Sequence, residues 1–362
     1  MKAILPILSL LFCLNTFAQL NTALDNILNE EAANRPGIAL MIEENGRIIY
    51  QKAEGIANDS TKQVLAVNSN FRMASVSKQF TAMGILLLEK EGKLSINDPI
   101  RKYLPELTAV SCNKILVKHL LTHSSGLWDY EALIPSNQTT QLSDADVLKL
   151  LQTQDSTYFT PGEKFRYSNS GFCLLALIVE RVSHQSFASF IKEKIFAPLH
   201  MDASAVYEAG KNIQHRAMGY AKDSTGNIFF SDQSVTSATK GDGGVYTSLI
   251  DYRKWMHALQ QNKLINLTKT MERLRFKIAT ADNSYYAAGW FSIFSTPEIL
   301  FHSGSTCGFN NFVIFVPERK LSIVYFSNLA DNLLPFKKVV TALKVQGVGD
   351  FSNVGTLHEL TR

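Results

Sequence analysis

The stretch Phe71-Arg72-Met73-Ala74-Ser75-Val76-Ser77-Lys78 leads into a helical pattern that places Phe80 and Leu87 on one face. Residues three apart on a helix are neighbours, with β-carbons about 5–6 Å apart, so we expect Ser75 and Lys78 to meet on the first turn. The free backbone N–H groups and the positive end of the helix dipole favour developing negative charge at that turn. A serine hydroxyl becomes a good nucleophile only when a base takes its proton, and a lysine made neutral by burial can be that base. The pattern therefore predicts an activated serine in a buried cleft.

The Ser-x-x-Lys spacing alone identifies nothing, because it occurs at four positions: Ser75, Ser111, Ser189 and Ser237. No helix opens on Ser111, and Ser189 falls in the middle of a helical pattern. Ser237 runs into the glycine-rich loop at 241–244. Only Ser75 has the context that the chemistry requires.

The segment Tyr167-Ser168-Asn169 is the only Tyr-x-Asn in the chain. It follows Thr160-Pro161-Gly162-Glu163, which is typical of a turn, so we expect it on a loop. A phenol beside a lysine can share protons with it, and an amide can hydrogen-bond the lysine or a substrate carbonyl. This pair is therefore a candidate partner for Ser75 and Lys78.

The segment His302-Ser303-Gly304 is likewise the only His-x-Gly, and it follows an apolar run typical of a strand. A glycine at position 304 would let a substrate backbone approach closely. The N–H group of Ser305 would then be placed to donate to a developing oxyanion.

Strand signals lie at both ends of the chain. Apolar runs at 38–42 and 48–50 flank Asn45-Gly46, and runs at 312–316 and 321–326 form a second hairpin signal. Helical patterns cover 22–34, 144–153, 171–182 and 333–345. This order predicts an α+β fold, in which an antiparallel sheet flanked by helices is built from both chain ends around an inserted, mostly helical domain.

The predicted organisation begins with a secretory signal peptide over residues 1–18, cleaved near Ala18. Its apolar stretch is too short for a membrane span, which needs about 20 residues. A discontinuous sheet domain is expected over 19–98 plus 226–346, a helical insertion domain over 99–225, and a C-terminal tail over 347–362. The mature protein would be exported, to the periplasm or the medium.

The composition excludes several classes of protein. With 46% hydrophobic residues and a net charge of +4 over 362 residues, the chain is neither disordered nor a nucleic-acid binder. Removing the signal peptide takes away Lys2 and leaves 35 − 32 = +3. Four cysteines make neither a disulfide scaffold nor a zinc site, and the signal peptide removes one of them, Cys13. No cofactor is indicated, and the sequence does not indicate an oligomeric state.

A metal-dependent hydrolase is an alternative, because His119 and His123 stand four residues apart. The glutamate that would follow the first histidine of a metalloprotease helix is replaced by Leu120, and no third ligand is evident. An α/β-hydrolase would need Gly-x-Ser-x-Gly, whereas Thr306 is the middle residue of the one matching glycine pair, Gly304 and Gly308.

The set Ser75-x-x-Lys78, Tyr167-x-Asn169 and His302-x-Gly304 resembles the serine β-lactamase / penicillin-binding protein superfamily. The most similar branch holds class C β-lactamases, D-alanyl-D-alanine carboxypeptidases and related esterases. The resemblance extends over about residues 25–345 and includes supporting stretches at 71–74, 94–100, 119–127 and 243–247. It implies a β-lactamase/transpeptidase-like fold.

The resemblance also implies roles for individual residues. Ser75 would be the acylated nucleophile, Lys78 its proton-relay partner and Tyr167 the general base, although the division of labour between the last two stays open. The N–H groups of Ser75 and Ser305 would form the oxyanion hole. The substrate would be held by Asn169, His302, Ser303 and Gly304.

One departure narrows the expected activity. Many members have Lys-Thr-Gly where this chain has His302-Ser303-Gly304, so a fixed cation is replaced by an imidazole. That argues against an efficient β-lactamase and leaves peptidase and esterase activities. We expect an exported serine hydrolase for D-amino-acid peptides, β-lactams or small esters, peptidoglycan peptides included. A slow or non-turnover penicillin-binding sensor on the same fold is the other alternative.

Overall fold

The computed structural model describes residues 4–278 and 284–354. The α-helices are α1 (Ile4–Ala32), α2 (Lys78–Lys90), α3 (Val117–Leu121), α4 (Asp144–Gln152), α5 (Asn169–Ser183), α6 (Phe187–Ile191), α7 (Leu249–Gln260), α8 (Leu267–Leu274) and α9 (Leu334–Val345). The strands of the large sheet are β1 (Ile38–Glu44), β2 (Arg47–Glu54), β10 (Phe276–Lys277), β11 (Ser284–Ala287), β12 (Trp290–Ile293), β13 (Ile299–Thr306), β14 (Phe309–Val316) and β15 (Leu321–Ser327). The short strands are β3 (Ile56–Asn58), β4 (Gln63–Val64), β5 (Phe71–Arg72), β6 (Ala205–Val206), β7 (Tyr220–Lys222), β8 (Ile228–Phe230) and β9 (Val245–Thr247).

The large sheet has eight strands in the order β10-β11-β12-β13-β14-β15-β1-β2, and every neighbouring pair is antiparallel. The N-terminal hairpin joins the C-terminal one through β1 and β15, with Ile38 opposite Ser327 and Glu44 opposite Leu321. The turn between β1 and β2 has positive φ at Asn45 (54°) and Gly46 (79°), as a tight hairpin of this twist requires. Both predicted hairpins and the α+β fold class are confirmed.

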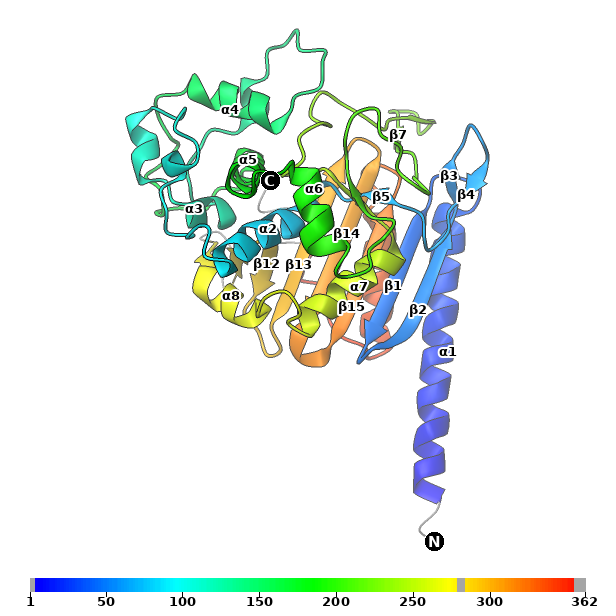
Figure 1. The fold of residues 1–362 in the computed structure, drawn as a ribbon. Coiled ribbons are helices and arrows are strands. Elements are labelled where there is room, and N and C mark those ends of the chain that lie inside the picture. Colours follow the sequence, from blue (N-terminus) through cyan, green and yellow to red (C-terminus); the bar gives the residue numbers. More distant parts are fainter. Residues whose placement is uncertain (1–3, 279–283, 355–362) are drawn as a thin grey trace.

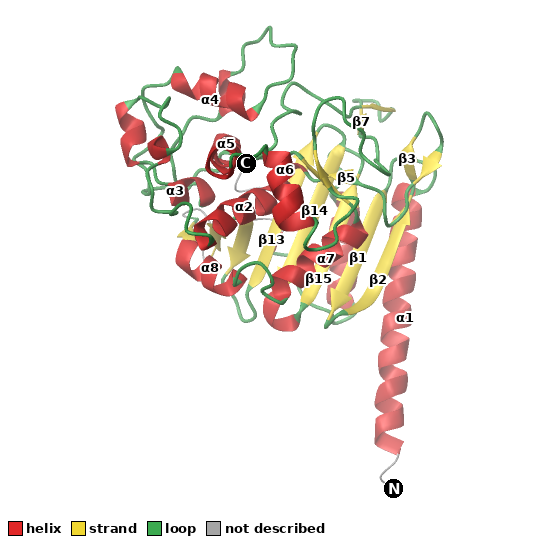
Figure 2. Ribbon diagram, in the orientation of Figure 1, coloured by secondary structure: helices red, strands yellow, loops and turns green. Residues whose placement is uncertain are grey.

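Helices cover both faces of this sheet (Figure 2). In Figure 1, α7 lies in front of the sheet, and α1 and α9 lie behind it and pack against each other. Leu20, Leu24, Leu28 and Ala32 of α1 are buried, and their spacing of four residues marks one face of the helix. Within 4–278 and 284–354, no helix has the length and apolar character needed to cross a membrane.

In the middle of the chain, long loops connect the helices α3, α4, α5 and α6, and α5 joins this part to α2. Helix α5 packs against α2, α3 and α4, and the run Phe172–Val179 is buried throughout. That run fits the core helix predicted for it. The boundaries proposed for the two domains stay a prediction. At the C-terminus, Phe351 and Val354 are buried, so this part of the tail packs on the core.

Candidate active site

Ser75 lies in a 3-10 turn, Ala74–Ser77, that runs directly into α2. Strand β5 before the turn pairs with β9, and Met73 N–H donates to the Val245 carbonyl at 2.8 Å. The sequence pattern predicted a helix opening on Ser75, and the structure places a tighter turn there. The position of the serine is thus fixed by the strand before it and by the helix after it.

Lys78 is fully buried, with 0% of its surface exposed, and its amine has three hydrogen-bond partners. They are Ser75 Oγ at 3.0 Å, Asn169 Oδ1 at 2.8 Å and the Asp242 carbonyl at 2.9 Å. The expected contact between Ser75 and Lys78 is present, and Asn169 joins it from the first residue of α5. Side chains from two distant segments therefore meet at one amine.

Gly304 makes the close approach of β13 to this turn possible. A β-carbon at position 304 would lie 2.3 Å from the Met73 carbonyl and 3.1 Å from the Ser75 nitrogen. From the sequence, we expected this glycine to allow the close approach of a substrate backbone. In the structure the backbone that approaches it is the chain's own nucleophile turn.

Tyr167 lies on a loop, as predicted, two residues before α5. Lys78 Nζ is 5.0 Å from the centroid of its ring. Its hydroxyl is buried and has no hydrogen-bond partner among the residues that the structure describes. The ring of Tyr167 thus lies near the Lys78 amine, whereas its hydroxyl forms no hydrogen bond with Ser75.

His123 fixes the backbone on either side of Tyr167. Arg166 N–H donates to the His123 carbonyl at 2.9 Å, and Ser168 N–H donates to His123 Nδ1 at 3.1 Å. Burial first, and then the charge of Lys78, lowers the pKa of His123 well below its ordinary value, so the ring is neutral. Because Nδ1 accepts, the proton of the neutral ring lies on Nε2.

The metal alternative finds no support in the described part of the chain. His119 Nδ1 accepts a hydrogen bond from Leu116 N–H at 3.2 Å, and burial lowers the pKa of His119 to about 4. No cluster of three or more His, Cys, Asp or Glu side chains suited to a metal ion occurs within 4–278 and 284–354. His119 and His123 act as structural residues.

His302 lies on β13 but does not line the pocket at Ser75. It is 1% exposed, with Nδ1 2.6 Å from the Ser303 carbonyl and Nε2 3.3 Å from the Tyr286 hydroxyl. Its ring packs against Phe291, with centroids 5.2 Å apart. Ser305 and Thr306 of the same strand do line the pocket, and the substrate contact expected of His302 stays a prediction.

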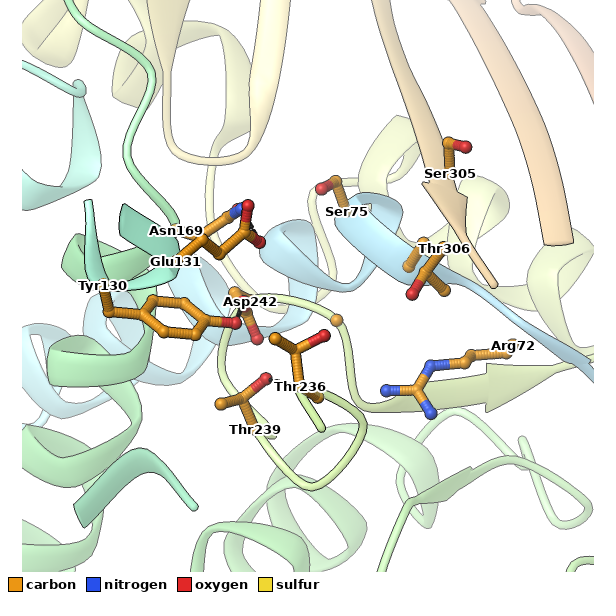
Figure 3. A pocket seen from close by; sticks show the side chains of 12 residues that line it. Arg72, Ser75, Tyr130, Glu131, Asn169, Thr236, Thr239, Asp242, Ser305 and Thr306 are labelled. Carbon is orange, nitrogen blue, oxygen red and sulfur yellow. Dashed lines mark hydrogen bonds between the residues drawn. The ribbon is translucent and has the colours of Figure 1, made fainter. Parts of the chain in front are cut away.

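Ser75 opens onto a small pocket of about 50 Å³ (Figure 3). Its lining comprises Arg72, Ala74, Ser75, Tyr130, Glu131, Asn169, Thr236, Thr239, Asp242, Gly243, Ser305 and Thr306. Figure 3 shows Tyr130, Glu131, Asn169 and Asp242 gathered on one side and Arg72 on the opposite side. From the sequence alone we did not assign Tyr130, Glu131 and Asp242 to the site, because a short 3-10 helix (Tyr130–Leu133) and a loop carry them, and neither has a periodic pattern.

The carboxylates on that side perturb one another. Burial and the neighbouring carboxylates Asp129 and Asp242 raise the pKa of Glu131, and burial raises the pKa of Asp129. Behind them, burial and the charge of Asp242 raise the pKa of Asp144 to about 7, although Asp144 accepts backbone N–H bonds from Lys240 and Gly241. The charge of Lys78 opposes the shifts of Asp129 and Glu131, because it lowers the pKa of both carboxyl groups.

Residues 22–344 match the family model described as Beta-lactamase. The chain is 32% identical to penicillin-binding protein 4* of Bacillus subtilis (strain 168) over 309 residues, which are 80% of this chain and 67% of that protein. It is 28% identical to Protein flp of Staphylococcus aureus (strain COL) over 348 residues, 91% of this chain and 66% of that protein. The chain thus spans about two thirds of the length of these relatives. The crystal structure of a penicillin binding protein from Bacillus halodurans superposes with a TM-score of 0.77 at 26% identity, covering 89% of this chain and 98% of that one.

Proposed function

Because the chain belongs to the β-lactamase family, we propose that it is a serine hydrolase that forms an acyl-enzyme on Ser75. The family match confirms the resemblance inferred from the three motifs. The solved structures confirm the β-lactamase/transpeptidase-like fold. The substrates that we propose are D-amino-acid peptides, β-lactams or small esters.

The observation that carries this proposal is the 3.0 Å contact between Lys78 Nζ and Ser75 Oγ. The other two partners of the amine, Asn169 Oδ1 and the Asp242 carbonyl, can only accept hydrogen bonds. Lys78 Nζ donates to Ser75 Oγ in the structure; in the neutral form of the amine, two N–H bonds can serve the other two acceptors and the lone pair can face the serine hydroxyl. Lys78 is thereby placed to take the proton of Ser75.

In the acylation step, Ser75 Oγ forms a bond to the acyl carbon while its proton passes to Lys78. The bond between the acyl carbon and the leaving oxygen or nitrogen then breaks, and the leaving atom takes the proton from the lysine. In deacylation a water molecule forms a bond to the acyl carbon, the bond to Ser75 breaks, and the serine regains a proton. The geometry favours Lys78 over Tyr167 as the first proton acceptor, because the Tyr167 hydroxyl is not bonded to either residue.

The oxyanion of the intermediate would be held by the N–H groups of Ser75 and Ser305, and both residues line the pocket. Strand β12 pairs with β13 only from Ile299 to Phe301. Beyond that point the free edge of β13 faces the turn that carries Ser75, which it contacts closely. This arrangement leaves backbone donors near the nucleophile.

We also propose that the protein is exported, and that cleavage near Ala18 removes the signal peptide, residues 1–18. Among the residues of α1 from Ala18 onward, whose burial the structure describes, Leu20 is the first buried one, so cleavage near Ala18 would leave it and the buried residues after it in place. N-terminal sequencing of the protein recovered from the periplasm or the medium tests this. A mature N-terminus upstream of residue 15 would contradict it.

The function is tested by intact-mass labelling with a fluorescent penicillin and a fluorophosphonate, followed by hydrolysis of p-nitrophenyl acetate. Wild-type protein should gain the mass of one label on Ser75, and Ser75→Ala should gain none. Labelling by both reagents favours a penicillin-binding enzyme, and labelling by fluorophosphonate alone favours an esterase. If Ser75→Ala hydrolysed the ester at the wild-type rate, the mechanism would be wrong.

A further inference from the structure

The loop at residues 240–244 supplies one of the three hydrogen-bond partners of the Lys78 amine. The partner is a backbone group, the Asp242 carbonyl, which lies 2.9 Å from Lys78 Nζ. The loop belongs to no helix or strand, so its peptide groups are not oriented by the regular hydrogen bonds of secondary structure. Whatever holds this loop therefore decides where the lysine amine finds its acceptor.

Asp144, the first residue of α4, holds part of this loop. Its Oδ2 accepts from Lys240 N–H at 3.0 Å, and its Oδ1 accepts from Gly241 N–H at 3.1 Å. Asp144 is only 5% exposed, and hydrogen bonds that are shielded from water in this way are strengthened. One carboxylate thus fixes two successive peptide groups directly before Asp242 in the chain.

Thr81, three residues after Lys78, holds the loop from α2. It is fully buried, and its hydroxyl donates to the Gly241 carbonyl at 2.6 Å. Thr81 and Lys78 lie on one face of α2, because residues three apart in a helix are neighbours. The four successive peptide groups between residues 239 and 243 are therefore each held by a side chain: the first two by Asp144, the third by Thr81 and the fourth by Lys78.

The 240–244 loop passes very close to α5. A β-carbon at Gly241 would lie 2.2 Å from the Phe172 carbonyl and 2.7 Å from Ala176 Cβ, so only glycine fits there. Glycine also has the widest choice of backbone conformations. The bonds to side chains of α4 and α2 therefore restrict a segment that would otherwise be free to change its conformation.

We propose that Asp144 is a positioning residue for the reaction at Ser75, because it fixes the carbonyl that orients the Lys78 amine. The inference rests on the proposed acyl-enzyme and adds to it a residue that does not line the pocket. With the Asp242 carbonyl in place, one N–H bond of Lys78 is directed to the loop, and the amine stays in contact with Ser75 Oγ. A displaced carbonyl would release that N–H bond and let the amine rotate out of line with the hydroxyl, which slows the first proton transfer. Thr81 contributes through the adjacent peptide group.

The test measures the rate at which a fluorophosphonate labels Ser75 in the full chain. The limiting rate constant and the half-saturating concentration are determined, and intact mass gives the fraction of protein labelled at the end point. Asp144→Ala removes the acceptor of both N–H groups, whereas Asp144→Asn keeps an amide oxygen for them. Thr81→Val removes the donor to the Gly241 carbonyl, so it tests the same loop should Asp144→Ala fail to fold.

Asp251→Ala is the matched control. Asp251 is 3% exposed and lies in the first turn of α7, and its Oδ2 accepts from the N–H groups of Ala203 and Ser204, each at 3.0 Å. It therefore holds another loop in the way that Asp144 does, but neither Asp251 nor that loop lines the pocket at Ser75. Asp251→Ala should lower the fraction of protein that is labelled and keep the limiting rate constant.

In Asp144→Ala we expect the limiting rate constant to fall by about tenfold or more, and in Thr81→Val by about threefold or more, with little change in the half-saturating concentration. Asp144→Asn should keep at least about half of the wild-type rate constant, because its amide oxygen can accept from the same N–H groups.

The inference is overturned, and the proposed function stands, if Asp144→Ala keeps the wild-type rate constant or, where that variant does not fold, if Thr81→Val keeps it. The same holds if Asp144→Asn loses as much as Asp144→Ala, since the hydrogen-bond acceptor would then be unimportant. An equal loss in Asp251→Ala also overturns the inference. If wild-type protein itself gains no label on Ser75, the proposed hydrolase function fails, and the inference fails with it.

Discussion

The imidazole of His123 stacks on the ring of Tyr167, with the two centroids 4.2 Å apart. The same residue accepts hydrogen bonds from the backbone on both sides of that tyrosine. The ring and the backbone carbonyl of this one buried residue thus hold the Tyr167 loop against Lys78.

Replacing His123 should misplace this loop. His123→Ala removes both the stacking ring and the acceptor for Ser168 N–H, so we expect fluorophosphonate labelling of Ser75 to slow by about tenfold or more. His123→Asn should recover part of the rate, because its amide oxygen can accept from Ser168 and because asparagine tolerates the positive φ of 53° at this position. Equal labelling rates in wild type and both variants would contradict a positioning role.

Lys78 and Tyr167 should be separable by mutation. Lys78→Ala removes the group in contact with Ser75, so labelling should fall by about 10²–10⁴-fold. Tyr167→Phe removes a hydroxyl that has no partner in the described chain, so its effect should stay below about tenfold. Tyr285→Phe, on β11, controls for the loss of a phenol elsewhere. A loss in Tyr167→Phe as large as in Lys78→Ala would assign the first proton transfer to the tyrosine.

Gly304→Ala tests the close contact between β13 and the nucleophile turn. The new β-carbon would meet the Met73 carbonyl at 2.3 Å, and this contact involves backbone that cannot rotate away. We expect a loss of about 1–3 kcal/mol of stability and a fall in labelling, because the turn that carries Ser75 must shift. Urea unfolding and labelling kinetics measure the two effects.

Gly171→Ala is the matched control for this substitution. Gly171 is also buried, but its nearest neighbours would lie 3.7 Å from a new β-carbon, and it sits inside α5, where alanine is favoured over glycine. We therefore expect fluorophosphonate to label Gly171→Ala at the wild-type rate. Equal behaviour of the two alanine variants would show that the contact at Gly304 is unimportant.

Asp144 should make stability depend on pH in a defined direction. Its pKa is raised to about 7 in the folded protein, so between about pH 4 and 7 the folded state holds a proton that the unfolded state has released. The free energy of unfolding therefore falls with rising pH in that window, by up to about 1.4 kcal/mol per pH unit from this group. Asp144→Asn should remove this slope while keeping an acceptor for Lys240 and Gly241 N–H.

The measurement is urea unfolding at pH 5 and pH 8 in wild type and Asp144→Asn, with the exposed Asp202→Asn as control. The difference between wild type and Asp144→Asn should grow in favour of the variant as the pH rises. A difference that is the same at both pH values would show that Asp144 titrates normally.

Sequence patterns located most of the elements that carry the site. Asn45-Gly46 predicted the first hairpin, and the buried run Phe172–Val179 predicted the core helix, because local propensity and periodicity decide both. The contact between Ser75 and Lys78 followed from helical spacing, although the turn proved to be a 3-10 turn.

What could not be predicted depends on long-range packing. One side of the pocket combines Glu131, from the 3-10 helix Tyr130–Leu133, with Asp242 from a distant loop, and no periodicity relates the two. The side chain of His302 turned into an aromatic cluster because Tyr286 and Phe291, on neighbouring strands, provide one. Gly304 proved to face Met73, a residue whose position depends on strand β5 pairing with β9.

The pairing of β1 with β15 has a consequence for how the protein is made. Ile38 cannot pair with Ser327 until nearly the whole chain has left the ribosome. Until then, the β1 edge of the N-terminal hairpin has no neighbouring strand. A two-stranded hairpin is marginally stable by itself. Synthesis therefore runs ahead of folding in this protein, and the central sheet is completed only when the last strand emerges.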